Sequence, residues 1–194
     1  MRKNRTKIEW DGPFGWPKLE GDLPSVPERP GVYLETVEYQ NGYLIYAAGI
    51  TGRSMPIRFK EHTRKYMSGF YNVLAIAAMK KGVRRKIWQG FWTDKPPKDR
   101  LAEYKKRQLK IQEAARKQLV GFRIFVANIG TRQRVRERIE AAIMNNLYDK
   151  QPKPFCDVPD RHMRLIPRRK SEKPIVIKNK CKSRLYGLPV YLEV

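Results

Sequence analysis

An Asn-Gly pair at 41–42 lies between two runs of β-branched and aromatic residues, 32–39 and 43–48, and this pattern constrains the fold most. Both positions of the pair tolerate positive φ, which favours a tight hairpin turn. Side chains alternate along a strand, so Tyr33 and Glu35 are expected to share a face. The same alternation groups three residues of the second strand: Leu44, Tyr46 and Ala48.

The hairpin leads through a glycine-containing loop, 49–52, into a predicted helix. Ser54 is a candidate cap for this helix, and Pro56 falls in its first turn, where a missing N–H is harmless. Arg58 and His62 are four positions apart, which places them on one helix face. We therefore expect a tyrosine, an arginine and a histidine to project together beside the loop.

A third strand is predicted at 122–128, followed by a helix for which Thr131 is the candidate cap. Glu140 borders the apolar stripe of that helix, and a carboxylate beside a buried face needs a partner. One alternative is Arg136, four residues earlier. The other is a divalent cation, because Mg²⁺ takes one or two protein carboxylates and keeps several waters.

The charge balance indicates a polyanionic partner. Lys and Arg number 42 against 19 Asp and Glu, a formal net charge of +23. Such an excess along the whole chain favours nucleic-acid binding through counterion release. No apolar run approaches the length of a membrane span, so we expect a soluble cytoplasmic protein that has no membrane partner and is nucleoid-associated when bound to DNA.

Metal-ligand spacing gives no support for zinc. Cys156 and Cys181 are too few for a disulfide framework. With His62 and His162 they make four potential ligands, but without the paired spacing of zinc sites.

The chain divides into an N-terminal arm at 1–30, a core at 31–160 and a basic C-terminal extension at 161–194. An insertion occupies about 70–119 of the core. Its second half is predicted helical, with one basic side that is either a solvated face or a phosphate-contacting face; the lysines concerned include Lys105, Lys106 and Lys110. For Trp88 and Trp92, packing in the core is favoured over stacking on a base.

Gly-Val-Tyr at 31–33 and Arg-Phe-Lys-Glu-His at 58–62 resemble the signature of the GIY-YIG nuclease family. In the second half of the signature, Gly49 places Ala47 where the family has its tyrosine, and Tyr46 is one residue early. Either a one-residue bulge brings Tyr46 into that place, or its function is missing. Two further matches lie downstream: Glu140 stands where the family has its metal ligand, and Asp157 where it has an asparagine.

The resemblance implies an α+β domain with a small three-stranded antiparallel sheet, 31–37, 42–48 and 122–128, flanked by helices. It implies a Mg²⁺-dependent endonuclease, with Mn²⁺ as an alternative metal, that cuts double-stranded DNA at specific sites in a restriction, mobile-element or phage setting. Cutting both strands with one metal site per core is consistent with a homodimer on DNA.

The resemblance also implies roles for the candidate residues. Tyr33 or Tyr46 would orient or deprotonate the water, Arg58 would bind phosphoryl oxygens, and His62 would relay a proton or form a hydrogen bond with a tyrosine. Glu140 would ligate the metal. Further cations near the site are expected to contact phosphates: Arg53, Lys60, Arg64 and Lys65. Two other functions remain open, a non-catalytic nucleic-acid-binding protein with a decayed active site and an RNA-directed protein.

Overall fold

The computed structural model describes residues 4–19, 23–130, 132–160, 165 and 168–194. Two residues considered above, Thr131 and His162, lie outside the described residues. The elements in chain order are β1 (Asn4–Phe14), β2 (Gly31–Tyr39), β3 (Gly42–Thr51), α1 (Met55–Met67), β4 (Val73–Leu74), α2 (Ile76–Met79), β5 (Lys86–Trp88), α3 (Lys98–Gly121), β6 (Phe122–Ala127), α4 (Gln133–Lys150), β7 (Ile175–Cys181), β8 (Leu185–Tyr186) and β9 (Tyr191–Glu193).

Seven strands form one mixed, strongly curled half-barrel sheet in the order β8-β3-β2-β6-β1-β7-β9, and β4 pairs with β5 in a separate sheet. The predicted three-stranded antiparallel sheet is therefore wrong. Its three strands, β3, β2 and β6, pair antiparallel in the middle of the larger sheet. β1 is added antiparallel to β6 and parallel to β7, and β8 is added parallel to β3.

β1 comes from the segment that the sequence indicated to be an arm. Its residues alternate between buried apolar side chains, Ile8 and Trp10, and exposed charged ones. The Trp10 indole donates a hydrogen bond to Asn179 Oδ1 on β7, at 3.1 Å. The strand thus depends on a partner far along the chain, which local periodicity does not reveal.

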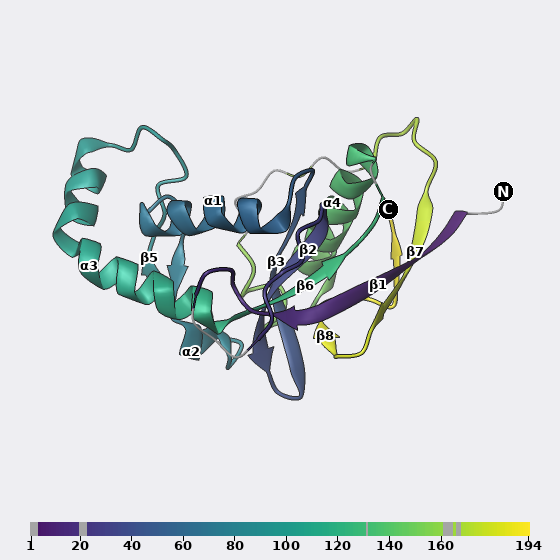
Figure 1. Cartoon of the computed structure of the whole chain (residues 1–194), viewed down its shortest axis with the longest axis horizontal. Helices are drawn as coiled ribbons and strands as arrows, with labels where there is room; N and C mark the ends of the chain where they lie inside the picture. The colour runs from purple at the N-terminus through teal and green to yellow at the C-terminus, as the bar shows by residue number, and fades with distance from the viewer. Residues whose placement is uncertain (1–3, 20–22, 131, 161–164, 166–167) are drawn as a thin grey trace.

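The two faces of the sheet carry different helices (Figure 1). On one face lie α1, α3 and the rest of the insertion, over a cluster that includes Tyr33, Phe59 and Phe122. On the other lies α4, over a cluster that includes Leu34 and Phe125. α1 begins at Met55, after Ser54, but the Ser54 side chain makes no capping hydrogen bond.

The two tryptophans of the insertion differ in environment. Trp88 is 1% exposed and donates its indole N–H to the Gly69 carbonyl oxygen at 2.8 Å, so its placement in the core is confirmed. Trp92 is only partly buried and has a φ of +54°.

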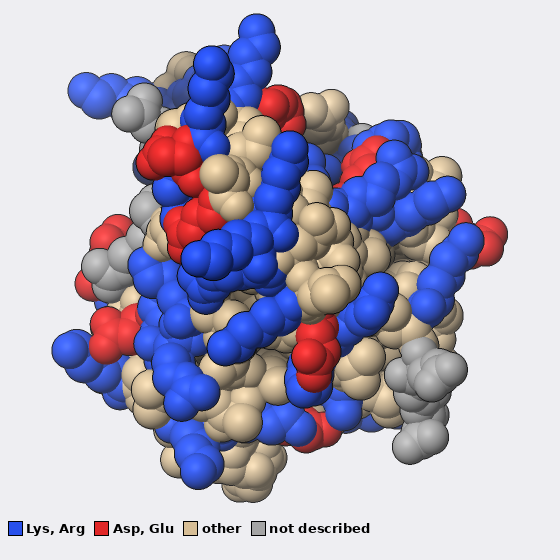
Figure 2. Space-filling view, turned by 90° about the vertical axis from the view of Figure 1, so that its left-hand side faces the viewer, with Lys and Arg blue, Asp and Glu red and all other residues tan. Residues whose placement is uncertain are grey.

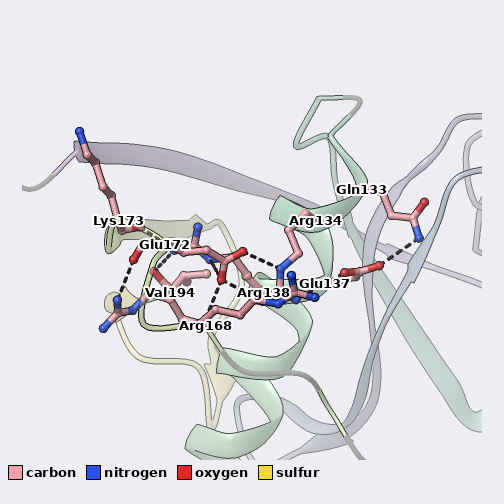
Figure 3. A network of polar contacts seen from close by, with 9 residues as sticks. Gln133, Arg134, Glu137, Arg138, Arg168, Glu172, Lys173 and Val194 are labelled. Atoms are coloured by element: carbon pink, nitrogen blue, oxygen red, sulfur yellow. Dashed lines mark hydrogen bonds and ion pairs between the residues drawn. The ribbon is translucent and has the colours of Figure 1, made fainter.

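Polar contacts fasten the C-terminal segment to α4 (Figure 3). The Arg134 guanidinium donates two hydrogen bonds to the Glu172 carboxylate, at 2.7 and 2.9 Å. Arg138 donates to the carbonyl oxygens of Lys173 and Val194, at 2.8 and 2.7 Å. These contacts hold both ends of the β7–β9 segment against the same helix.

Within the described residues, no helix is both long enough and apolar enough to cross a bilayer. Cys156 and Cys181 form no disulfide with each other or with any other described residue.

Candidate active site

The pairing of β2 with β3 is irregular at one position. Glu35 lies opposite Ala47, but the next residue of β2, Thr36, lies opposite Ile45. Tyr46 is therefore the additional residue of a β-bulge, which bends a strand and re-aims its side chains.

The bulge decides where Tyr46 points. Tyr46 is buried in the same cluster as Tyr33, whereas Ala48 is buried in the cluster on the α4 face. The expectation that Leu44, Tyr46 and Ala48 share one face is therefore wrong for Ala48. The structure has the one-residue bulge that the first of the two alternatives for Tyr46 requires.

A cavity of about 250 Å³ opens beside this bulge. The structure brings all five candidate catalytic residues to its walls, although they come from β2, β3, α1 and α4. Those residues are Tyr33, Tyr46, Arg58, His62 and Glu140.

Two of the lining residues share a hydrogen bond, between the Tyr33 hydroxyl and His62 Nε2, at 2.7 Å. Burial lowers the pKa of His62 to about 3, and the charges of Arg58 and Lys65 act in the same direction, so the imidazole is neutral at neutral pH. Burial, followed by the charge of Glu35, raises the pKa of Tyr33 above its ordinary value. The charge of the nearby Arg58 guanidinium opposes that rise. Tyr33 and His62 therefore form a neutral pair.

Two carboxyl groups share the cavity with Arg58. Burial raises the pKa of Glu35 to about 8 and that of Glu140 to about 7, and in both cases the Arg58 guanidinium opposes the rise. Glu35 is 4% exposed and makes no hydrogen bond with any residue that the structure describes. The sequence placed Glu35 on the same face as Tyr33 but gave it no role, and strand alternation was the one signal that pointed to it.

Asp160 lines the cavity as well, and the sequence did not single it out. Its carboxylate is 4% exposed and accepts hydrogen bonds from Tyr46 at 3.3 Å and Asn72 at 2.5 Å, and it pairs with Arg84 at 3.2 Å. The described residues that line the cavity do not include Asp157, which forms a mostly exposed ion pair with Lys153 at 3.5 Å.

The described part of the chain contains no group of three or more His, Cys, Asp or Glu side chains that could hold a metal ion. A hydrated Mg²⁺ needs only one or two protein carboxylates. The raised pKa of Glu140 means that its negative charge is poorly compensated, and a divalent cation would supply that compensation. The residues present therefore fit a hydrated cation on Glu140, with few direct protein ligands.

The predicted phosphate-contacting cations lie around this cavity and beyond it. Arg53 is exposed and paired with Glu61 at 2.9 Å, and Lys65 lines the cavity with its Nζ 4.2 Å from the Phe70 ring centroid. The remaining predicted cations are exposed on α1 and α3: Lys60, Arg64, Lys105, Lys106 and Lys110. Figure 2 views the end of the molecule that carries α3, where Lys and Arg side chains spread across the surface with acidic ones scattered among them.

Comparisons of this chain with protein-family models, curated proteins and solved structures found no match.

Proposed function

We propose that this chain is a GIY-YIG-like, metal-dependent DNA endonuclease that hydrolyses phosphodiester bonds. One observation carries the proposal: residues chosen from the sequence for this chemistry, from four separate elements, line a single cavity. The reaction needs a positioned water, stabilisation of charge on the phosphorus oxygens and help for the departing oxygen. Each need has a candidate group on the cavity wall.

Arg58 is the candidate for charge stabilisation. Its side chain is 34% exposed, so its guanidinium is accessible from the cavity while remaining fixed beside Tyr33. A guanidinium presents several N–H donors in one plane and suits the paired oxygens of a phosphodiester.

Tyr33 and His62 are the candidates for orienting and deprotonating the water. The Tyr33 hydroxyl can accept a water proton as it passes its own proton to the neutral His62 imidazole. A bound phosphodiester would offset the charge of Arg58, which is the second cause, after burial, of the low pKa of His62. Tyr46 lines the same cavity, and its hydroxyl donates a hydrogen bond to Asp160, which fixes the position of its ring.

Glu140 is the candidate metal ligand. When bound, a divalent cation such as Mg²⁺ or Mn²⁺ supplies Lewis-acid stabilisation of the negative charge on the departing oxygen. Glu140 would hold it through its carboxyl group, and the charge of Arg58 favours the ionised form of that group. Double-stranded DNA is the proposed partner, with a homodimer to cut both strands. The proposed enzyme is a site-specific one of restriction, mobile-element or phage type that acts in the cytoplasm. The net charge of +23 supports its binding of polyanionic DNA.

Plasmid cleavage tests the proposal. The purified protein is incubated with plasmid and with longer mixed-sequence DNA, in Mg²⁺, Mn²⁺ or EDTA, beside Arg58→Ala and Glu140→Gln. Discrete fragments should require metal and disappear in both variants. Glu137→Gln, one turn earlier on α4 and paired with Arg134, is the matched control and should cut normally.

A non-catalytic nucleic-acid-binding protein is the second candidate. It is favoured by the lack, among the described residues, of a cluster with three or more metal-ligating side chains. Plasmid that is retarded but uncut with every metal would support it and contradict the nuclease proposal. Matched RNA in the same assay distinguishes an RNA-directed protein.

A further inference from the structure

Three aromatic side chains form one wall of the candidate active site. Phe70, Tyr71 and Trp92, hereafter the aromatic wall, are each partly buried and line the cavity. The ring centroids of Tyr71 and Trp92 are 5.1 Å apart, and those of Phe70 and Tyr71 are 5.4 Å apart. The wall therefore presents contiguous aromatic surface to the cavity instead of filling the core as Trp88 does.

The backbone fixes this wall in place. The Trp92 N–H donates to the Phe70 carbonyl oxygen at 3.0 Å, and the preceding Phe91 N–H donates to the Gly69 carbonyl oxygen at 3.1 Å. Trp92 itself has a φ of +54°, a conformation that bulky residues rarely adopt. Such outliers concentrate at ligand-binding positions, where the surrounding structure holds them.

The aromatic wall contacts a candidate catalytic residue, His62, on one side and a cationic side chain, Lys65, on the other. The Tyr71 ring lies 5.6 Å from the His62 ring, at an interplanar angle of 34°. The Lys65 ammonium lies over Phe70, 4.2 Å from its centroid. A ligand on the wall would therefore combine a flat π surface with a negative charge near Lys65 and Arg58.

Glu35 adds a polar group to the same cavity. It is nearly fully buried, lines the cavity and has no hydrogen-bond partner among the described residues. A buried polar group without a partner is costly, which indicates a ligand that supplies one. At about 250 Å³ the cavity is smaller than most small-molecule sites, which span roughly 300–1,000 Å³. It suits one flat ring system better than a longer stretch of nucleic acid.

We propose that the aromatic wall and Glu35 bind the base of an unpaired nucleotide beside the phosphodiester that Arg58 holds. Every base has a π face that stacks on aromatic side chains, and base edges carry N–H donors that a carboxyl oxygen accepts. A base within an intact duplex cannot reach such a pocket unless it leaves the stack. The substrate class is thus duplex DNA with an unpaired or extruded nucleotide at the cut site. This inference deepens the proposed nuclease function and rests on it.

Binding of 2-aminopurine DNA in EDTA tests the inference. Two duplexes of otherwise identical sequence carry 2-aminopurine either paired with thymine or as a single unpaired nucleotide. The protein should bind the unpaired form at least about fivefold more tightly, as expected for one stacked base, and should quench its emission.

Variants of the aromatic wall test whether it causes the preference for the unpaired base. Trp92→Ala and Phe70→Ala should lose the preference and the quenching, whereas Trp92→Phe should keep both because an aromatic face remains. Tyr191→Ala is the matched control: Tyr191 is 56% exposed on β9 and has Lys178 5.7 Å from its ring centroid, away from the cavity. Thermal melts verify that each variant is folded.

Equal affinity for the two duplexes, or a preference that survives both alanine substitutions, would overturn the inference. The binding assay contains no metal and requires no cleavage, so its outcome is independent of the outcome of the plasmid assay. Plasmid cleavage without a preference for the unpaired base would overturn only the base site. A preference without cleavage would overturn the nuclease function and leave the base site standing.

Discussion

Gly49 lies directly opposite Tyr33 in the β2–β3 pair, and the Tyr33 ring covers it so closely that a Cβ on Gly49 would overlap the phenol oxygen. The absence of a side chain at Gly49 therefore determines where the Tyr33 hydroxyl sits, and with it the hydrogen bond to His62.

Gly49→Ala should displace the Tyr33 ring. We expect a loss of about 1–3 kcal/mol in stability from overpacking. Cleavage should fall about a hundredfold, because a misplaced catalytic group is costly. Gly52→Ala is the control, since among the described residues a Cβ there would meet Arg136 alone, at an ordinary 3.8 Å. Denaturant unfolding and plasmid cleavage measure both effects, and equal behaviour of the two variants would contradict the prediction.

Glu35→Gln should make the protein more stable at high pH. The pKa of Glu35 is raised from an unfolded value near 4.5 to about 8, so its contribution to stability is fully present below about 4.5 and is lost as the pH rises through 8. Glutamine cannot ionise, and the advantage of the variant should grow over this window by about 1.4 kcal/mol per pH unit. Unfolding in EDTA between pH 4 and 9 measures it.

Glu38→Gln is the control on the same strand. Its pKa is lowered by Lys80 and Arg123, so this variant should lose stability at neutral pH. A flat pH dependence for Glu35→Gln would show that Glu35 ionises normally.

Asp160→Ala should destabilise the protein by about 3 kcal/mol, because it leaves the Arg84 charge and the Asn72 amide without their buried acceptor. Asp157→Ala removes a mostly exposed ion pair with Lys153 and should stay within about 0.5 kcal/mol of the parent protein. Urea unfolding of the two variants gives the comparison. Similar losses for both variants would mean that the buried contacts of Asp160 do not stabilise the protein more than an exposed ion pair does.

Replacing the three α3 lysines should weaken DNA binding in a salt-dependent manner. Each phosphate that a lysine neutralises contributes about 0.9 to the slope of log affinity against log salt, so Lys105→Ala, Lys106→Ala and Lys110→Ala together should make that slope shallower by about 2.7. The control replaces three exposed lysines of the C-terminal segment: Lys178, Lys180 and Lys182. Titrations at several salt concentrations decide between a phosphate-contacting face and a solvated one.

Glu172→Gln should weaken the attachment of the C-terminal segment at neutral pH. Arg134 and the Arg169 backbone N–H lower the pKa of Glu172 to about 2, so its contribution is present above about 4.5 and is lost as the pH falls toward 2. The variant and the parent should therefore converge in acid. Hydrogen exchange of the β7 and β9 amides follows the attachment directly, and Glu113→Gln, in an exposed ion pair with Lys117 on α3, is the control.

Local patterns predicted the local elements. The Asn-Gly turn, the helix that carries Arg58 and His62, and the helix that carries Glu140 each depend on nearby residues, and each is present in the structure. The strands β1, β7, β8 and β9 were not predicted as part of the sheet because they form by pairing between distant segments. Proline, glycine and charged residues in those segments hid the alternation that Ile8 and Trp10 carry.

In the candidate site, too, features set by nearby residues were predictable and features set by distant contacts were not. Spacing along α1 and the strand pattern of β2 brought Arg58, His62 and Tyr33 into consideration, whereas the bulge at Tyr46 stayed one of two alternatives because register is a property of the strand pair. Asp160 follows Pro159 in an irregular segment, and no periodicity marks it. Its importance arises from three partners that lie far away in sequence.

β1 joins the middle of the sheet to its C-terminal strands, and its Trp10 contacts a residue 169 positions later. Closing a loop of that length is entropically costly, so this pairing is expected to form late and slowly. Until β7 arrives, one edge of β1 exposes unpaired backbone groups to which another chain can add. During synthesis on the ribosome, the nascent protein therefore carries an open strand edge from the time β6 pairs with β1 until β7 is made, and a chaperone that covers this edge should raise the yield of folded protein.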